Sequence, residues 1–306
     1  MNEGCRHADG KRIISSVLAG VNLQRLHERS AQLALGLSER HGMLDGGAIT
    51  RWMFDLPTYV IADLFGFSEA KLPQIARWTA DFVGCLSPLA TDEQLTNASI
   101  AAQCLGEAVQ GLLNGDVLAQ RILDAGWTDH DTCFANIIGL LSQTREATAG
   151  LLGNCIAALL EQPGMQERLR AGPYLVPAFA SEVARFDAPV QNTRRFVAQA
   201  TTVAGVTQKR GDVIVLVLGA AGRDLRADPQ ADVFLLERLQ RKLTGFGHAR
   251  HACPGQDIAF TIGTAAVQHL IALLHPPSAQ DLGWTYAPSV NARLPQFFNL
   301  PLKGQP

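Results

Sequence analysis

The chain has 306 residues, a formal net charge of −2 and 47% hydrophobic residues, enough to bury a substantial core. The near-neutral charge argues against a nucleic acid or another polyanion as partner. Its six cysteines lack paired spacing, a pattern that fits reduced cytoplasmic thiols rather than a disulfide framework. Because no signal peptide opens the chain and no apolar run could span a bilayer, we expect a soluble cytoplasmic protein without membrane association.

Helical periodicity dominates the first 160 residues, where apolar positions repeat between Gly, Asn and Pro breakers. The predicted helices cover residues 11–18, 23–40, 49–64, 71–82, 92–113 and 116–123. Neither an internal repeat nor a low-complexity linker separates them. Since nothing marks a boundary, we expect residues 1–306 to form one domain.

His7 and Lys11 lie four residues apart at the start of the first predicted helix, so their side chains share a face. Arg12 is the other basic residue of the same turn. A frayed, solvated terminus explains these residues equally well.

The longest helical pattern covers residues 136–160, ~25 residues and ~37 Å, enough to cross a domain of this size. Its middle is polar between apolar turns and reads Ser142, Gln143, Thr144, Arg145, Glu146, Ala147, Thr148. Polar side chains inside a core-crossing helix are costly unless they serve a site. The alternative is a solvated stripe in which Arg145 and Glu146 face water.

Glu182 and Arg185 lie at i and i+3 on the next predicted helix, a pair that carries little weight alone. The chain then becomes rich in strand formers, with a strand at residues 201–204 and a buried strand within the apolar run 213–221. A short hairpin is predicted over residues 284–298. Together these elements predict a mainly helical α+β fold with small β-sheets.

One cysteine ends a loop over residues 246–255 and precedes a predicted helix over 256–274 that is apolar on nearly every face. Cys253 therefore lies at a helix N-terminus, where unpaired N–H groups and the dipole lower a thiol pKa and favour the metal-binding thiolate. Gly247 and Gly255 let the backbone approach whatever the sulfur binds.

Two other interpretations of this loop remain. A buried structural cysteine is common, but it does not explain the offsets of the Phe, Gly and His before it. His248, His251 and Cys253 could bind zinc, yet a structural zinc site needs four ligands and no CxxC or HxxxH partner is present.

The loop resembles the cysteine-ligand loop of the cytochrome P450 family, Phe-x-x-Gly-x-(Arg/His)-x-Cys-x-Gly. Phe246, His251, Cys253 and Gly255 match it, whereas Ala249 stands where the family has its second Gly. The resemblance implies that Cys253 is the axial ligand of a haem b iron, Phe246 packs near the sulfur, and His251 binds a haem propionate. A thiolate ligand favours O–O cleavage.

The polar middle of the central helix resembles the family's (Ala/Gly)-Gly-x-(Asp/Glu)-Thr motif, which runs over the haem and delivers protons. Glu146 matches the acid, Ala147 replaces the alcohol against the haem, Thr144 replaces the Gly, and Thr148 comes one residue late. Either Thr148, a water or a substrate hydroxyl then delivers the proton, or oxygen is not activated in the usual way.

The other matches follow the family's order along the chain. His7 and Lys11 look like a weakened His-x-x-x-Arg pair that grips the propionates, and Arg195 has the offset for a third propionate contact. If this copy is real, the part of the family's chain that normally precedes it, including the roof of the substrate pocket, is missing from the sequence.

The Glu-x-x-Arg pair of the family corresponds to Glu182 and Arg185, and Arg238 stands where the family completes a buried network. The implied role is structural. Arg238, Arg241, Lys242 and Arg250 bracket the cysteine loop, and we expect a positive docking face for an acidic partner there, with plain solvated basic residues as the alternative.

The resemblance implies a bacterial-type P450 monooxygenase that inserts one oxygen atom from O2 into a small, largely apolar organic substrate. Electrons would come from NAD(P)H through a ferredoxin and a reductase, because no flavin or iron–sulfur motif is present. A haem-thiolate peroxygenase, isomerase or dehydratase is the first alternative, motivated by Ala147. A degenerate haem-binding protein without turnover is the second, motivated by Ala249 and Lys11.

Overall fold

The computed structural model describes residues 4–42, 45–87, 89–112, 118–127, 130–162, 164–273 and 282–300. Its α-helices are α1 (Cys5–Ala19), α2 (Leu23–His41), α3 (Gly46–Phe65), α4 (Leu72–Val83), α5 (Asp92–Gln110), α6 (Leu118–Asp124), α7 (His130–Glu161), α8 (Met165–Ala171), α9 (Val176–Phe186), α10 (Leu218–Gly222) and α11 (Gln256–Leu273). Its strands are β1 (Asn192–Phe196), β2 (Thr201–Val203), β3 (Val206–Gln208), β4 (Val213–Val217), β5 (Leu282–Tyr286) and β6 (Pro295–Asn299). The predicted fold class, helix-rich with small sheets, is confirmed.

Side-chain caps define where several helices begin. Asn22, Asp45 and Thr91 each accept a hydrogen bond from the backbone N–H three residues further on, which satisfies a donor that the first turn leaves unpaired. These caps explain why α2 and α5 start at the predicted residues. Capped by Asp45, α3 starts one turn earlier than predicted, because two glycines at its start weaken the helical pattern there.

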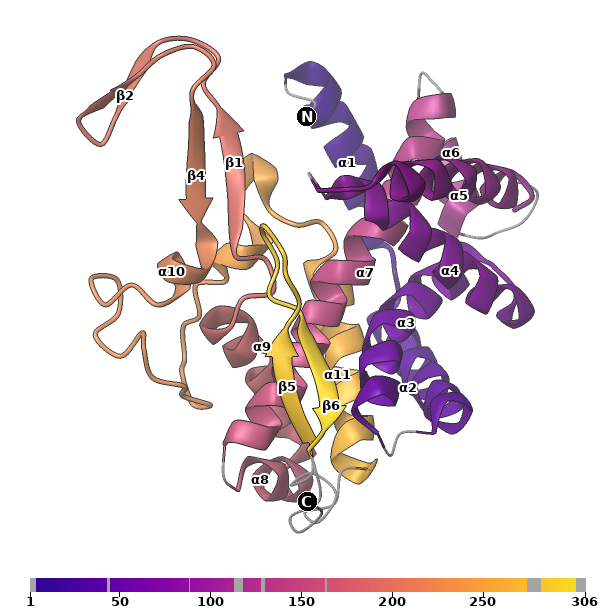
Figure 1. The fold of residues 1–306 in the computed structure, drawn as a ribbon, viewed down its shortest axis with the longest axis vertical. Helices are drawn as coiled ribbons and strands as arrows, with labels where there is room; N and C mark the ends of the chain where they lie inside the picture. The colour runs from indigo at the N-terminus through magenta and orange to yellow at the C-terminus, as the bar shows by residue number, and fades with distance from the viewer. Residues whose placement is uncertain are drawn as a thin grey trace.

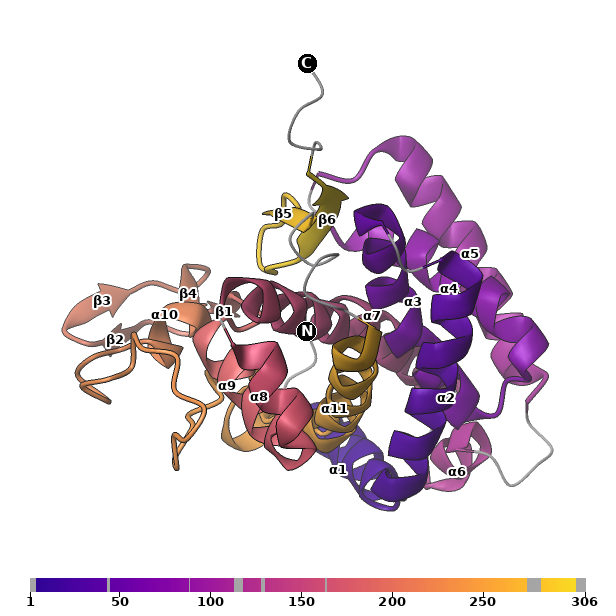
Figure 2. The ribbon, with the colours of Figure 1, turned by 90° about the horizontal axis from the view of Figure 1, so that it is seen from below.

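Helix α7 runs through the middle of the molecule, between α3 and α4 on one side and α9 with the β5–β6 hairpin on the other (Figures 1 and 2). It begins six residues before the predicted residue 136. Two of its glycines permit this packing. A Cβ at Gly150 would lie 2.9 Å from Cβ of Pro189, and one at Gly153 would lie 2.8 Å from Cδ of Pro295.

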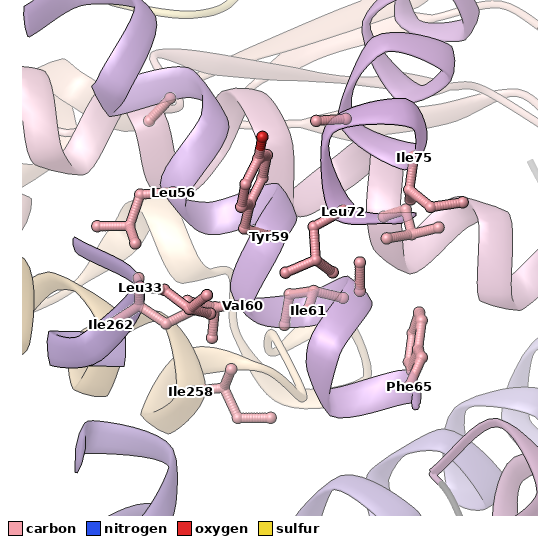
Figure 3. Packing of buried hydrophobic residues seen from close by; sticks show 14 of the residues in the cluster. Leu33, Leu56, Tyr59, Val60, Ile61, Phe65, Leu72, Ile75, Ile258 and Ile262 are labelled. Carbon is pink, nitrogen blue, oxygen red and sulfur yellow. The ribbon is translucent and has the colours of Figure 1, made fainter. Parts of the chain in front are cut away.

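A hydrophobic core joins α2, α3, α4 and α11 beside α7 (Figure 3). Trp52 and Phe65 of α3 are among its largest fully buried side chains. Because α3 carries apolar residues on several faces, it touches α2, α4 and α7 at once. This core holds one face of α11 through Ile258, Ile262, Ala266 and Leu270, and the first turn of that helix follows Cys253.

The described strands form three separate two-stranded antiparallel sheets, β1–β4, β2–β3 and β5–β6. The predicted C-terminal hairpin is confirmed by β5–β6. The prediction of a buried strand at residues 213–221 is wrong, because Val213, Val215 and Val217 are about half exposed and the chain turns helical at Leu218. The β1–β4 ladder extends outward from the helical body, so little of the molecule covers it (Figure 1).

None of the helices in the described part of the chain is both long and apolar enough to cross a membrane.

A partly buried polar contact joins α2 to α11. Ser38 Oγ lies 2.6 Å from Nε2 of His269 and donates to the Ala34 carbonyl at 2.8 Å, so the ring nitrogen is the donor to Ser38. The His269 ring also stacks on Trp52, with centroids 6.1 Å apart. Burial lowers the pKa of His269 below its ordinary value.

We predict that His269 makes the protein less stable in mild acid. The folded state binds this proton less readily than the unfolded chain does, so stability is complete above the ordinary His pKa of about 6.5 and falls as the pH drops below it. His269→Gln keeps a donor near Ser38 without the titration. Chemical denaturation should show a smaller loss of unfolding free energy between about pH 7 and about pH 5. Equal losses in both proteins would contradict the prediction.

Candidate functional site

The loop before α11 is closed by its own backbone. Cys253 N donates to the Phe246 carbonyl at 2.7 Å, and two 3-10 turns, Thr244–Phe246 and Ala249–His251, lie between Leu243 and Ala252. Gly247 makes the closure possible: its φ is +72°, and a Cβ there would lie 2.3 Å from the His251 carbonyl oxygen. The Phe, Gly and Cys offsets read from the sequence are therefore the positions where this loop closes.

Ala249 occupies a backbone conformation that suits glycine. Its φ is +49°, and within the described residues Ala204 is the other non-glycine residue with a positive φ. A Cβ in the left-handed region clashes with the following carbonyl, at a cost of about 1–2 kcal/mol. The loop therefore carries local strain two residues before His251.

Cys253 lies where the loop meets α11 and is exposed on one side. Burial by the surrounding chain raises the pKa of its thiol, while the Gly255 backbone N–H and the charge of Lys11 act to lower it. The prediction that the helix N-terminus would lower this pKa is wrong in its net direction. The N–H contribution is present, but desolvation outweighs it.

A hollow of about 300 Å³ with positive lining opens beside the loop, between it and the first turns of α1. Its lining residues are Gly4, His7, Ala8, Lys11, Arg12 and Arg250. The His7 and His251 rings lie 5.1 Å apart, and Lys11 donates to the Ala252 carbonyl. The suspected frayed terminus is thus part of α1, and the structure brings His7, Lys11 and His251 together.

Arg195 does not line this hollow. It lies on β1, opposite Ile214, where it donates to Thr193 Oγ1 at 3.1 Å and to the Arg194 carbonyl at 2.9 Å.

The polar middle of α7 divides between two faces. Thr144 and Thr148, four residues apart, line a cavity that Gly255, Ile258 and Ala259 close from the other side. Glu146 and Ala147 are half-buried but do not line it. Burial raises the pKa of Glu146, and the neighbouring Arg145 opposes that rise.

Arg145 faces α3 rather than the cavity or water. Its guanidinium lies 5.0 Å from the Phe54 ring centroid, donates to the Phe54 carbonyl at 3.4 Å and is 4.0 Å from Oδ1 of Asp55. His41 also contacts this carboxylate, at 3.1 Å. The interpretation of Arg145 as part of a solvated stripe is therefore wrong, because its side chain is only 16% exposed.

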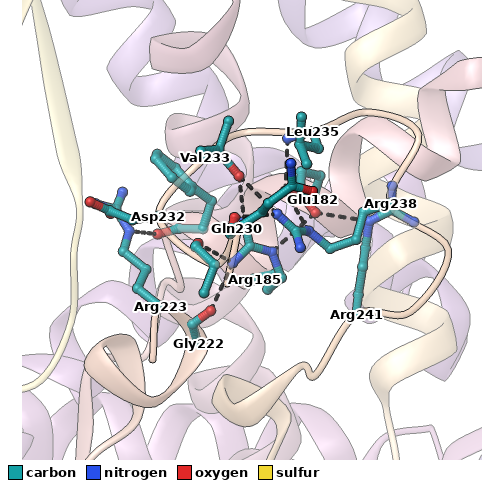
Figure 4. A network of polar contacts seen from close by, with 12 residues as sticks. Glu182, Arg185, Gly222, Arg223, Gln230, Asp232, Val233, Leu235, Arg238 and Arg241 are labelled. Atoms are coloured by element: carbon teal, nitrogen blue, oxygen red, sulfur yellow. Dashed lines mark hydrogen bonds and ion pairs between the residues drawn. The ribbon is translucent and has the colours of Figure 1, made fainter. Parts of the chain in front are cut away.

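A fully buried carboxylate organises the segment that leads to the loop (Figure 4). Glu182 accepts two hydrogen bonds from Arg185, at 2.7 and 3.1 Å, and one from Arg238 at 3.2 Å. Burial raises the pKa of Glu182, but these bonds and one from the Leu235 N–H hold it below its usual value. Arg185 also donates to the carbonyls of Gly222, Ala231 and Val233.

Arg241 belongs to the same network, which the sequence did not reveal. Its Nε lies 3.0 Å from Glu182 Oε2, and the side chain is only 13% exposed. The docking face predicted from Arg238, Arg241, Lys242 and Arg250 is therefore wrong as a set, because the first two point into the Glu182 network. Lys242 and Arg250 are exposed. No short-range pattern marked Arg241 as a partner of a residue 59 positions earlier.

Within the described ranges, no group of three or more His, Cys, Asp or Glu side chains could hold a metal ion. The zinc interpretation of His248, His251 and Cys253 therefore has no support in the geometry.

No family model matches this sequence. The chain is 27% identical over 255 residues to the "Biotin biosynthesis cytochrome P450" of Bacillus subtilis, covering 78% of this chain and 63% of that protein. It is 28% identical over 294 residues to "Cytochrome P450 107B1" of Saccharopolyspora erythraea, covering 92% and 72%. The chain thus spans less than two thirds of the length of the first relative and 72% of the length of the second.

Solved structures share the fold. P450BioI, crystallised with an acyl carrier protein carrying hexadec-9Z-enoic acid, matches with a TM-score of 0.84 and 23% identity, covering 97% of this chain and 79% of that one. CYP109B1 from Bacillus subtilis matches with a TM-score of 0.85 and 21% identity, covering 97% and 84%. The arrangement of α1 to α11 with small sheets is therefore the fold of these proteins.

Replacing Ala249 by Gly should stabilise the loop. Gly accepts the positive φ without the Cβ clash but loses more chain entropy on folding, so Ala249→Gly should raise the unfolding free energy by about 0.5–1 kcal/mol. Ala204→Gly, at the same φ of +49° in the β2–β3 turn, is the matched control and should gain a similar amount. Denaturant melts of the three proteins measure both gains. A loss of stability in Ala249→Gly alone would show that the Ala249 methyl group makes a needed contact.

Proposed function

The chain belongs to the cytochrome P450 family, and from this we propose that it is a haem-thiolate monooxygenase acting on a small, largely apolar organic substrate. The observation that carries the proposal is the loop closed by the Cys253 to Phe246 hydrogen bond. It presents one exposed sulfur at the start of a buried helix. A site with a single thiol donor would suit a haem, because the porphyrin itself supplies most of the ligands of the iron.

The proposed cofactor is haem b, whose iron Cys253 would hold. When bound, it would supply the oxygen chemistry, since a thiolate ligand favours O–O cleavage. The residues present fit such a group. Cationic and imidazole side chains line the hollow beside the loop, where they can bind two propionate carboxylates. We assign that role to His7, Lys11 and His251.

Arg195 is a weaker candidate for the same role, because it donates to its own strand. It would contribute only after its side chain leaves Thr193 and the Arg194 carbonyl.

Thr144 and Thr148 are the side chains of α7 that we propose hold and pass protons. A hydroxyl can donate and accept at once, and both line the cavity that Gly255 closes. Ala147, which stands in the family's alcohol position, offers no such group. Glu146, whose burial raises its pKa, can carry a proton at a higher pH than an exposed carboxylate. Because residues two apart on a helix do not face each other, water would have to pass that proton on to the hydroxyls.

The proposed substrate class draws on the relatives. One relative is named "Vitamin D(3) 25-hydroxylase", and one solved neighbour is described in complex with corticosterone. We propose that electrons reach this protein from NAD(P)H through a ferredoxin and its reductase. Lys242 and Arg250 are the exposed cations near the loop that would attract an acidic partner.

A haem-thiolate peroxygenase is the second candidate function. Ala147 favours it, because a peroxide brings its own protons and does not depend on a delivered one. Isomerase and dehydratase chemistry would also avoid that step.

Carbon monoxide binding to the reduced protein tests the proposal. We expect a difference band at about 450 nm in the wild-type protein and none in Cys253→Ala, because the band requires a thiolate on the iron. Cys85→Ala, at a half-buried cysteine elsewhere in the fold, is the matched control and should keep the band. Wild-type protein that takes up no haem, or Cys253→Ala that keeps the band, would refute the function.

The threonine pair makes a second prediction. Removing a proton-passing hydroxyl should lower product formed per NAD(P)H by about a hundredfold in the Thr144→Ala, Thr148→Ala double variant. Thr96→Ala, at an exposed position of α5, should leave the yield unchanged. Peroxide in place of NAD(P)H and partners should restore the double variant. If the double variant couples as well as wild type, the hydroxyls do not carry the proton.

A further inference from the structure

Arg241 enters the buried network without being needed for its charge balance. Arg185 and Arg238 already face two carboxylates, because Glu182 contacts both and Asp228 pairs with Arg238. Arg241 adds a third positive charge, and Glu182 is its carboxylate partner among the described residues. Both Arg241 and Arg185 donate to the same oxygen, Oε2, at 3.0 and 3.1 Å.

The contacts of Arg241 instead hold the chain at residue 241 in place relative to α9. While Nε reaches back to Glu182 on α9, Nη2 donates to the Leu236 carbonyl at 2.7 Å. One planar guanidinium thus ties the chain at residue 241 to a helix and to the preceding turn at once. No regular element holds this stretch, since the described chain between α10 and Thr244 has neither helix nor strand.

The cysteine loop begins three residues later. Thr244 Oγ1 donates to the Leu218 carbonyl at 2.8 Å, the Phe246 N–H donates to Leu243, and the Cys253 N–H donates to Phe246 at 2.7 Å. Through these bonds, the place of the sulfur depends on where residues 241–246 lie. The side chains of Arg241 and Thr244 connect that stretch to the rest of the fold by hydrogen bonds, and those of Leu243 and Phe246 pack against the hydrophobic cluster that includes α9.

We propose that Arg241 is a positioning residue for Cys253, which sets where the cysteine loop starts relative to α9. This inference rests on the proposed role of Cys253 as haem ligand, although its structural part does not need a haem. Glu182, Arg185 and Arg238 hold the network together, whereas Arg241 transmits its position to the loop. Loss of Arg241 should therefore loosen the loop more than the remainder of the molecule.

Hydrogen exchange on the purified full chain tests the structural part. In Arg241→Gln, amides of residues 243–255 should exchange about tenfold faster than in wild type, while α2 and α3 stay unchanged. Arg241→Lys keeps the positive charge but loses the planar set of donors. Its exchange rates over residues 243–255 should therefore lie between those of wild type and Arg241→Gln. Ile75→Val, a buried change on α4, is the control for general destabilisation and should leave residues 243–255 as in wild type.

The reduced carbon monoxide spectrum, read well below the melting temperature of each variant, tests the functional part. Arg241→Gln should lose a larger share of the band at about 450 nm than Ile75→Val, and Arg241→Lys should recover part of it. Unchanged exchange over residues 243–255, or equal loss of the band in Arg241→Gln and Ile75→Val, would overturn the inference. Faster exchange in a protein whose wild type shows no band would leave the positioning role intact and refute the proposed haem function.

Discussion

A single buried carboxylate holds together the least regular part of this protein. Glu182 is fully inaccessible to solvent, and a lone ionised carboxylate in that environment would be prohibitively costly. Three guanidinium groups and one backbone N–H compensate for the lost water. Because they come from α9 and from a chain segment without helix or strand, satisfying the charge requires that segment to take one path. The path of that segment determines where the cysteine loop lies.

The spacing of apolar residues predicted most helices, because in this fold each of these helices buries its apolar residues on particular faces. Helices α2 and α5 begin at the predicted residues, where Asn22 and Thr91 cap the first turn. Strand β4 shows the limit of that reasoning. Its run of β-branched residues predicts a strand correctly, but burial depends on what lies against the strand, and no short-range pattern reports that. Strand β1 was missed because its two arginines and its asparagine are poor strand formers.

The features of the candidate site also fall into two groups: those that neighbouring residues determine, which the sequence predicts, and those that distant segments determine, which it does not. The loop offsets were readable because Gly247 must be Gly and the backbone carbonyl of residue 246 accepts from the Cys253 N–H, and both constraints lie within eight residues. The direction of the Cys253 pKa was predicted wrongly, since helix dipoles are visible in a sequence but desolvation by distant segments is not. The place of Arg241 was hidden for the same reason.

The polar middle of α7 contacts α3 with one face and lines a cavity with another. Residues 144 and 148 share a face, while residue 145 is turned by about 100° from residue 144, so neighbours in sequence serve different partners. Arg145 joins α3 through Phe54 and Asp55, whereas the hydroxyl-bearing Thr144 and Thr148 line the cavity beside Gly255. Substituting the alcohol position by Ala147 therefore does not empty that side of the helix of proton-bearing groups. It moves them one residue along, to position 148, and three residues back, to position 144.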